Sequence, residues 1–273
     1  MSDELERFRV GVVLDPKDEI DASILNHTLK MIIGLQLSSV FSDKEKHAAY
    51  FRYIMEAAQS LFKSNSHRRK YLHTEPIEIK SLFDSEIKKI NQNVDVGFNP
   101  IELNAEVDGF LSHIKATLDS IAKSFDILFG IKTGGWNKKG EISGIKILNQ
   151  LDNLPSDKKK RAQDLTNIIK DNVEWISYLV HLRDAPHHRG GIKSITDLVF
   201  DHKQKTVIPQ LIIHPGSQPE MVRDFLIRTI KNIDIFIGDM IASSLMAIAF
   251  PGCVIVKSEQ GFPPYSWAII KSK

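Results

Sequence analysis

ELNAEVDGFLSHIKATLDSIAKSFDILF, residues 102–129, carries the clearest structural signal in this chain. Apolar residues recur every three or four positions along it for about eight turns, which is the period of an α-helix with one buried face. Asn99-Pro100 precedes the stretch and Gly130 follows it, as is typical of the two ends of a helix. The pattern predicts a long amphipathic helix that packs against other helices.

Similar apolar stripes predict further helices on both sides of this stretch. A helix capped by Asp21 is expected to run to about residue 41, and a second from Ser42 to the polar segment SNSHRRK at 64–70. Further helices are expected over about residues 76–90, 142–151, 156–180 and 219–249. The fold class predicted is therefore mainly α, a helical bundle.

Two regions have the alternating pattern of β-strands instead. SITDLVFDHKQKTVIPQLIIH predicts a β-hairpin with strands at about 194–200 and 206–213, an insertion near 194–213, and Pro209 suggests that its strand lies at an edge. The tail GCVIVKSEQGFPPYSWAII can add one or two more strands. We place a seam near 91–99, which divides an N-terminal helical region, 1–95, from a larger helical domain, 96–273.

Composition excludes several classes of protein. The net charge is only +2, too small to predict a strongly nucleic-acid-binding surface, although it allows a local basic patch. Cys253 is the only cysteine, so a disulfide within the chain is impossible and a reducing cytoplasm is the expected location. The polar N-terminal residues do not resemble a secretory signal. Asp234 and Asp239 interrupt the most apolar segment, which we interpret as a buried core helix rather than a membrane span.

WISYLVHLRDAPHHRGG, residues 175–191, holds the residues best suited to chemistry. The buried stripe of the preceding helix continues to Arg183 and His187, and an arginine on such a face needs an anionic partner. Pro186 predicts that the helix ends or kinks there, which would bring His188 to the side of Arg183 although the two are about 140° apart on an ideal helix. The alternative is a helix cap, in which arginine and histidine offset the helix dipole and Asp184 pairs with Arg189.

Two other groups of residues leave alternatives open. His181, His187 and His188 lack the acidic or cysteine ligands that usually accompany a metal site, so neither a metal nor any other cofactor is expected. Basic residues gather at His67–Lys70 and at Lys158–Arg161. Each basic group is either solvated or in contact with an RNA phosphate backbone.

Arg183-Asp-Ala-Pro-His-His188 resembles the R-x4-H motif of the HEPN superfamily, in which a polar residue directly follows the arginine. The order of a long acidic-apolar helix, a loop, and a second long helix that carries the motif is also similar to that family. The resemblance covers roughly residues 100–190 and is strongest to the larger bacterial HEPN proteins linked to phage defence. It implies a helical fold and a metal-independent endoribonuclease.

The resemblance also implies roles for the residues of the motif. His188 would be the general acid or base, Arg183 the ligand of the scissile phosphate, Asp184 an orienting group and His187 a second base. Family members often combine two such sets across a two-fold axis, so we expect a homodimer.

Further residues and partners complete this hypothesis. Asp119 is our first choice for an acidic partner of Arg183 and Glu106 a second one. The candidate RNA contacts are Arg189, Lys158, Lys159 and Lys160. An RNA-cleaving toxin or abortive-infection effector would need an antitoxin or another regulatory partner, either protein or RNA. The alternative is a non-catalytic helical module that binds RNA or protein.

Overall fold

The computed structural model describes the backbone of residues 17–38, 44–82, 101–136, 144–188, 196–201, 206–211, 220–248, 253–258 and 266–271. It describes side chains for 17–28, 44–81, 101–136, 144–184 and 220–248. The helices are α1 (Glu19–Ser38), α2 (Lys44–Leu82), α4 (Ile101–Phe129), α5 (Ile145–Asp152), α6 (Ser156–Arg161), α7 (Gln163–His188) and α8 (Val222–Ile248). The mainly α bundle predicted from the sequence is confirmed.

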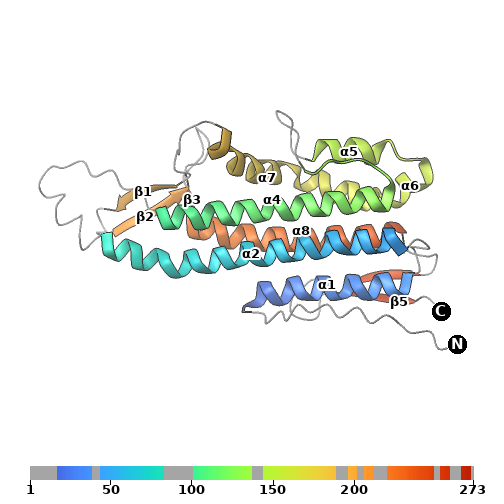
Figure 1. Cartoon of the computed structure of the whole chain (residues 1–273), viewed down its shortest axis with the longest axis horizontal. Coiled ribbons are helices and arrows are strands. Elements are labelled where there is room, and N and C mark those ends of the chain that lie inside the picture. Colours follow the sequence, from blue (N-terminus) through green and yellow to red (C-terminus); the bar gives the residue numbers. More distant parts are fainter. Residues whose placement is uncertain are drawn as a thin grey trace, which may run out of the picture.

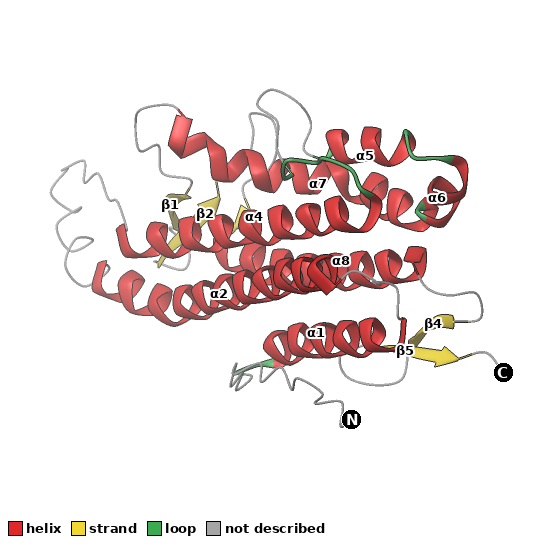
Figure 2. Ribbon diagram, turned by 45° about the vertical axis from the view of Figure 1, so that its right-hand side comes forward, coloured by secondary structure: helices red, strands yellow, loops and turns green. Residues whose placement is uncertain are grey.

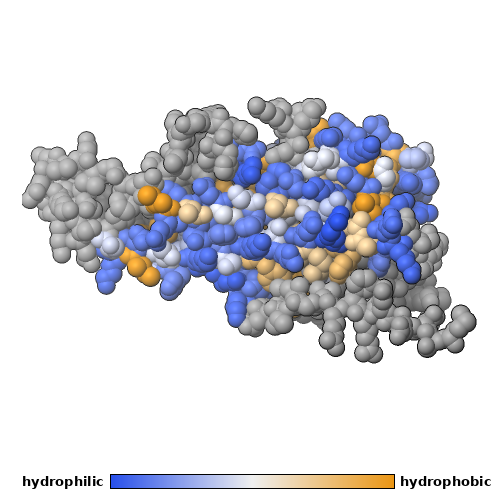
Figure 3. Space-filling view, in the orientation of Figure 1, coloured by the Kyte–Doolittle hydropathy of each residue, from blue (hydrophilic) through white to orange (hydrophobic). Residues whose placement is uncertain are grey.

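The long helices lie roughly parallel to one axis (Figures 1 and 2). α2 and α4 run antiparallel and pack together along much of their length, and α7 and α8 complete the bundle around α4. α1 packs against α2 and α8 on the opposite side of the bundle from α7. The face of α2 and α4 that Figure 3 shows is largely hydrophilic, with apolar residues mostly near its ends.

The buried face of α4 is the apolar stripe that the sequence predicts. Its members include Leu103, Val107, Phe110, Leu111, Ile114, Leu118, Ile121, Ala122, Phe125 and Phe129. They belong to a core cluster that also takes Ile20 and Ile24 from α1, Tyr50 and Leu61 from α2, and Ile233 from α8. Residues on both sides of position 95 thus share this core. The division at 95/96 stays a prediction, since the proposed seam at 91–99 lies outside the described residues.

α2 differs from the prediction, because it continues through SNSHRRK and through Pro76 to Leu82. The polar residues in its middle have partners on other helices: Ser64 Oγ donates to the carbonyl oxygen of Phe110, and Asn65 Nδ2 donates to Asp21 at 2.8 Å. A polar segment therefore marks contacts between helices here, not a loop. The buried side chains of Tyr71 and Glu75 show that packing continues up to the proline, which helps offset its cost of about 3 kcal/mol.

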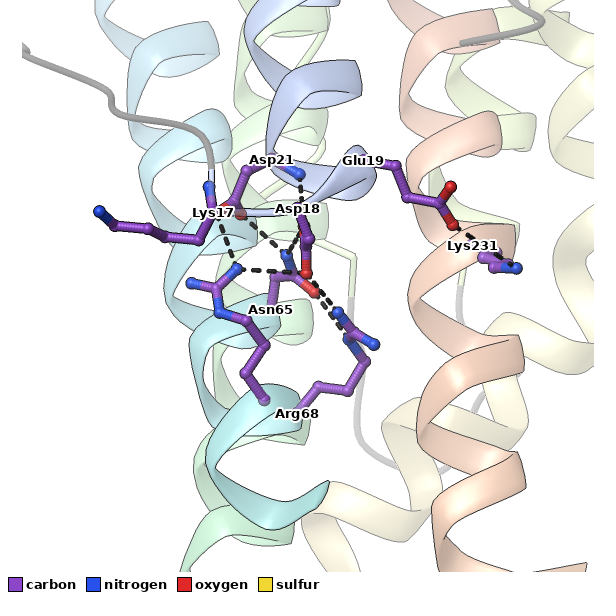
Figure 4. A network of polar contacts seen from close by, with 8 residues as sticks. Lys17, Asp18, Glu19, Asp21, Asn65, Arg68 and Lys231 are labelled. Carbon is purple, nitrogen blue, oxygen red and sulfur yellow. Dashed lines mark hydrogen bonds and ion pairs between the residues drawn. The ribbon is translucent and has the colours of Figure 1, made fainter. Parts of the chain in front are cut away.

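A network of charged residues joins the start of α1 to the middle of α2 (Figure 4). The Asp18 carboxylate accepts a hydrogen bond from the backbone N–H of Asp21, so Asp18, rather than the predicted Asp21, caps α1. Arg68 binds Asp18, and Arg69 Nη1 lies 2.7 Å from Asp21 Oδ2. Neither arginine of the predicted basic loop is a solvated loop residue.

The strands in the described part of the chain form two small antiparallel sheets. β1 (Thr196–Asp201) pairs with β2 (Thr206–Leu211), and β3 (Glu220–Met221) joins the other edge of β2, while β4 (Cys253–Ser258) pairs with β5 (Ser266–Lys271). The predicted hairpin and tail strands are therefore confirmed. Pro209 is not in an edge strand, because β2 lies between β1 and β3. Since β3 pairs only with Gln210 and Leu211, Pro209 needs no hydrogen bond on that side.

α8 is the buried core helix that the sequence predicts. Most of its residues are buried, and among them is Asp234, whose carboxylate accepts a hydrogen bond from Ser23 of α1. Among the described helices, none has the length and hydropathy needed to cross a membrane.

Candidate functional site

The C-terminal end of α7 holds the predicted motif. α7 extends from Gln163 to His188, so the helix does not end between Arg183 and the two histidines, while the alternative of a kink at Pro186 stays a prediction. Proline fixes φ near the helical value, so the backbone can stay helical through Pro186 although the missing N–H removes one hydrogen bond. The motif therefore lies on a helical backbone up to its last residue.

Helical continuity changes which positions share a side of α7. Arg183 and His188, five residues apart, are separated by about 140° around the axis, whereas Arg183 and His187 are separated by only about 40°. The side chains of both histidines, and the whole of Arg189, lie outside the described residues. The backbone thus favours His187 as the histidine on the side of Arg183.

Arg183 is the described residue of the motif with the most useful geometry. Its Nη1 donates to Asp184 Oδ1 at 2.8 Å, and its side chain is 35% exposed. Its Nε is buried and has no hydrogen-bond partner within the described part of the chain. The guanidinium is thus held by one carboxylate, in keeping with the orienting role expected for Asp184, and keeps donors for an anion.

The two acidic residues expected to support Arg183 bind other groups. Asp119 forms an ion pair with Lys115 at 2.5 Å and accepts a hydrogen bond from the backbone N–H of Trp136 at 2.8 Å. Asp119 therefore fixes the loop after α4, where Gly135 has a φ of +99°. Glu106 pairs with His67. The partner that the structure gives Arg183 is its own neighbour, Asp184.

His67, Glu106 and His113 form a second polar cluster, between α2 and α4. His67 Nδ1 lies 2.6 Å from Glu106 Oε2, and the rings of His67 and His113 stack with centroids 5.4 Å apart. The side chains of His67 and Glu106 are 24% and 22% exposed, so solvent reaches the pair. Burial, followed by the charges of His67 and Lys63, lowers the pKa of His113.

Gly109 explains how this cluster fits between the helices. It lies on α4 between Glu106 and His113, and a Cβ at this position would come within 2.5 Å of the His67 ring. From the sequence, His67 was expected to be either solvated or in contact with RNA, and the cluster was not predicted. The available signal was Glu106, Gly109 and His113 at helical spacing on one face of the longest clear stripe.

A third polar group is buried between α1 and α8. Ser23 Oγ donates to Asp234 Oδ2 at 2.5 Å, and His27 Nε2 lies 3.3 Å from Ser23 Oγ and 3.7 Å from Asp234 Oδ1. Burial raises the pKa of Asp234 to about 7, even though the hydrogen bond from Ser23 opposes this shift. The serine, histidine and aspartate are all buried, so we assign the group to the packing of α1 on α8.

The lysines that were predicted to contact RNA lie on α6. Lys158, Lys159 and Lys160 are all exposed, and Lys159 Nζ is 3.4 Å from Asp152 of α5. These side chains are accessible to a phosphate backbone, but nothing in their arrangement selects one. In the described part of the chain, no group of three or more histidine, cysteine, aspartate or glutamate residues is arranged to hold a metal ion.

Comparisons with protein-family models, with curated proteins and with solved structures found no match to this chain.

Proposed function

We propose that this protein is a metal-independent endoribonuclease of the HEPN type. The observation that carries the proposal is Arg183: a guanidinium near the end of a bundle helix, bound by the adjacent carboxylate of Asp184 and still 35% exposed to solvent. This is the residue to which the R-x4-H motif assigns the scissile phosphate. Its setting in a helical bundle agrees with the resemblance.

The chemistry needs no bound metal, because RNA carries its own nucleophile. A histidine takes the proton of the 2′-hydroxyl, and the 2′-oxygen attacks the neighbouring phosphorus while the bond to the 5′-oxygen breaks. Arg183 stabilises the charge that develops on the phosphate. The motif gives the histidine role to His188, and the continuous helix favours His187 within one chain, so both remain in the proposal.

The proposal also includes a homodimer and a contact surface for RNA. A homodimer would place two copies of the motif at a shared cleft and supply the second proton-transfer group that the reaction needs. The exposed lysines of α6, Lys158–Lys160, would bind the RNA backbone outside the cleft. The biological role we infer is a cytoplasmic toxin or phage-defence effector, controlled by an antitoxin of protein or RNA.

The test is cleavage of mixed single-stranded RNA by the full-length protein in EDTA. We expect products with 2′,3′-cyclic phosphate ends, and a loss of at least about 100-fold in Arg183→Ala, the usual size for removing a group that stabilises transition-state charge. Arg52→Ala is the matched control, because Arg52 is an exposed arginine on α2 whose neighbour Glu56 lies 3.9 Å away. Full activity of Arg183→Ala would contradict the proposal.

Parallel His187→Ala and His188→Ala variants decide the position of the catalytic histidine. Loss confined to His187→Ala supports the helical geometry, and loss confined to His188→Ala supports the register of the motif. Sedimentation analysis at several protein concentrations tests the homodimer.

A non-catalytic module that binds RNA or protein is the second candidate. The ion pair between Arg183 and Asp184 favours the form of this module that binds protein, since the carboxylate neutralises part of the charge that a phosphate would meet. RNA binding without cleavage in the same assay would select the form that binds RNA.

A further inference from the structure

Packing of two helices does not by itself explain the cluster of His67, Glu106 and His113. A glycine in the middle of a helix costs about 1 kcal/mol relative to alanine, yet α4 has Gly109 where the His67 ring lies. An apolar pair would join α2 and α4 without this cost. The sequence instead places two imidazoles and a carboxylate there, within reach of solvent.

The contacts of His67 leave one ring nitrogen available. Glu106 binds Nδ1, and no hydrogen bond to Nε2 is found within the described part of the chain. A carboxylate on Nδ1 fixes the orientation of the ring, as it does for the histidines of catalytic triads. His67 can therefore present an Nε2–H to a leaving oxygen.

His113 is suited to the opposite role. Its surroundings, which are burial and two neighbouring cationic groups, favour the neutral ring that a general base requires. Two imidazoles in unlike surroundings are the usual signature of an acid and a base that act together. Lys63, an exposed residue one turn before His67 on α2, adds a cation that can bind a phosphate oxygen.

We propose that His113 and His67 are a base and an acid for RNA cleavage, with Glu106 as a positioning residue and Lys63 as a phosphate ligand. The inference rests on the proposed ribonuclease function and assigns the two proton transfers to His113 and His67 in place of the histidines at the end of α7. RNA is the substrate class that fits, because each phosphodiester has a hydroxyl beside it and needs no cofactor.

His113 takes the proton of the 2′-hydroxyl, and the 2′-oxygen forms a bond to phosphorus. The bond between phosphorus and the 5′-oxygen breaks, and that oxygen takes the proton of the His67 imidazolium. The products are a 2′,3′-cyclic phosphate and a 5′-hydroxyl. Exchange of protons with water then returns both rings to their starting forms.

The experiment measures cleavage of single-stranded RNA in EDTA by His67→Asn and His113→Asn. Each should lose at least about 100-fold in rate, as expected for a general acid or base. His73→Asn is the matched control, because His73 is an exposed histidine on α2 outside the cluster, and it should cleave at the wild-type rate. Thermal melting of each variant shows whether it is folded.

Two further measurements separate a chemical role from a structural one. Glu106→Gln should lower kcat for cleavage more than it changes KM, because the orientation of the His67 ring matters for proton transfer and not for binding of RNA. A nucleoside 3′-monophosphate, used as a product analogue, should shift the ring-proton NMR signals of His67 and His113 in the wild-type protein, and Lys63→Ala should weaken that binding.

The outcomes distinguish this inference from the proposed function. If Arg183→Ala is inactive while His67→Asn and His113→Asn cleave normally, the inference is overturned and the ribonuclease stands. Absence of NMR shifts at saturating nucleotide also overturns it. If the wild-type protein cleaves no RNA, the proposed function fails and this inference fails with it.

Discussion

Asp234 has a buried carboxylate, and burial disfavours the charged form of such a group. It lies in the core between α8 and α1, where its neighbours are Ser23, His27 and a small cavity lined mainly by apolar residues such as Ile54 and Leu61. That cavity, of about 10 Å³, is close to the space that one water molecule needs. Burial favours the neutral carboxylic acid, so the fold binds a proton that the unfolded chain has released at the same pH.

This proton binding makes stability depend on pH. The pKa of Asp234 is about 7 in the fold against 3.8 in the unfolded chain, so its contribution is greatest below about pH 4 and is lost as pH rises towards 7. One pKa unit corresponds to about 1.4 kcal/mol, so the loss is at most about 4 kcal/mol. Asp234→Asn, which mimics the neutral acid, should therefore be more stable relative to wild type at pH 8 than at pH 5.

Urea denaturation at the two pH values measures this difference in the free energy of unfolding. Asp224→Asn, at an exposed aspartate in the first turn of α8, is the control and should change little between them. An equal effect of Asp234→Asn at pH 5 and pH 8 would show that Asp234 is ionised throughout.

The surface of α4 is adapted to a side chain of α2 that packs against it. Gly109 lets the His67 ring approach the helix backbone, and Gly238 of α8 does the same for His27, where a Cβ would come within 2.5 Å of that ring. Glycine in a helix interior is normally a weakness. Here both glycines are positions where a histidine from another helix takes the space of a side chain.

A double-mutant cycle tests this for Gly109. Gly109→Ala alone should destabilise the protein by about 1–3 kcal/mol, the usual cost of overpacking, because the new Cβ collides with His67. In the background of His67→Ala the same change should stabilise it by up to about 1 kcal/mol, since alanine favours the helix. Urea denaturation of the four proteins gives the coupling free energy, and additive effects would rule out the collision.

The helices could be predicted from the sequence better than the contacts between them. The stripe of α4 reveals its buried face, and the apolar period of α8 survives two aspartates, because periodicity is a local property of the sequence. The break expected in α2 was wrong because Asn65 and Arg68 bind residues far away in sequence. The contact between His67 and Glu106 was not predicted for the same reason, since 39 residues separate them in the sequence.

At the scale of the whole molecule, α1 is held to the bundle by two polar groups with opposite responses to pH. Burial raises the pKa of Asp18, but the hydrogen bonds from Asp21 and Asn65 and the charges of Arg68 and Arg69 outweigh it and hold that pKa below its usual value. This contribution is present above about pH 4 and is lost as pH falls through the lowered pKa. The contribution of Asp234 is lost in the other direction, so the attachment of α1 should be strongest in mildly acidic solution.

Asp21 is the residue on which this attachment most depends. Its carboxylate is buried and accepts hydrogen bonds from Asn65, Arg69 and the backbone N–H of Lys17, so Asp21→Ala leaves several donors without their acceptor. We expect a loss of about 2–3 kcal/mol, in the range for breaking a largely buried ion pair. Glu19→Ala is the matched control, since Glu19 is exposed in the same turn and lies 3.9 Å from Lys231, and such pairs contribute at most about 1 kcal/mol.

Hydrogen exchange and urea denaturation together show whether the loss is local or global. Ile20 and Ile24 of α1 belong to the same core as α2, α4 and α8, so α1 has no separate core within which to unfold. Asp21→Ala should therefore lower the urea midpoint of the whole bundle in one cooperative transition. If only the amides of α1 lost protection while the midpoint stayed unchanged, α1 would be a separately detachable helix and the bundle would be complete without it.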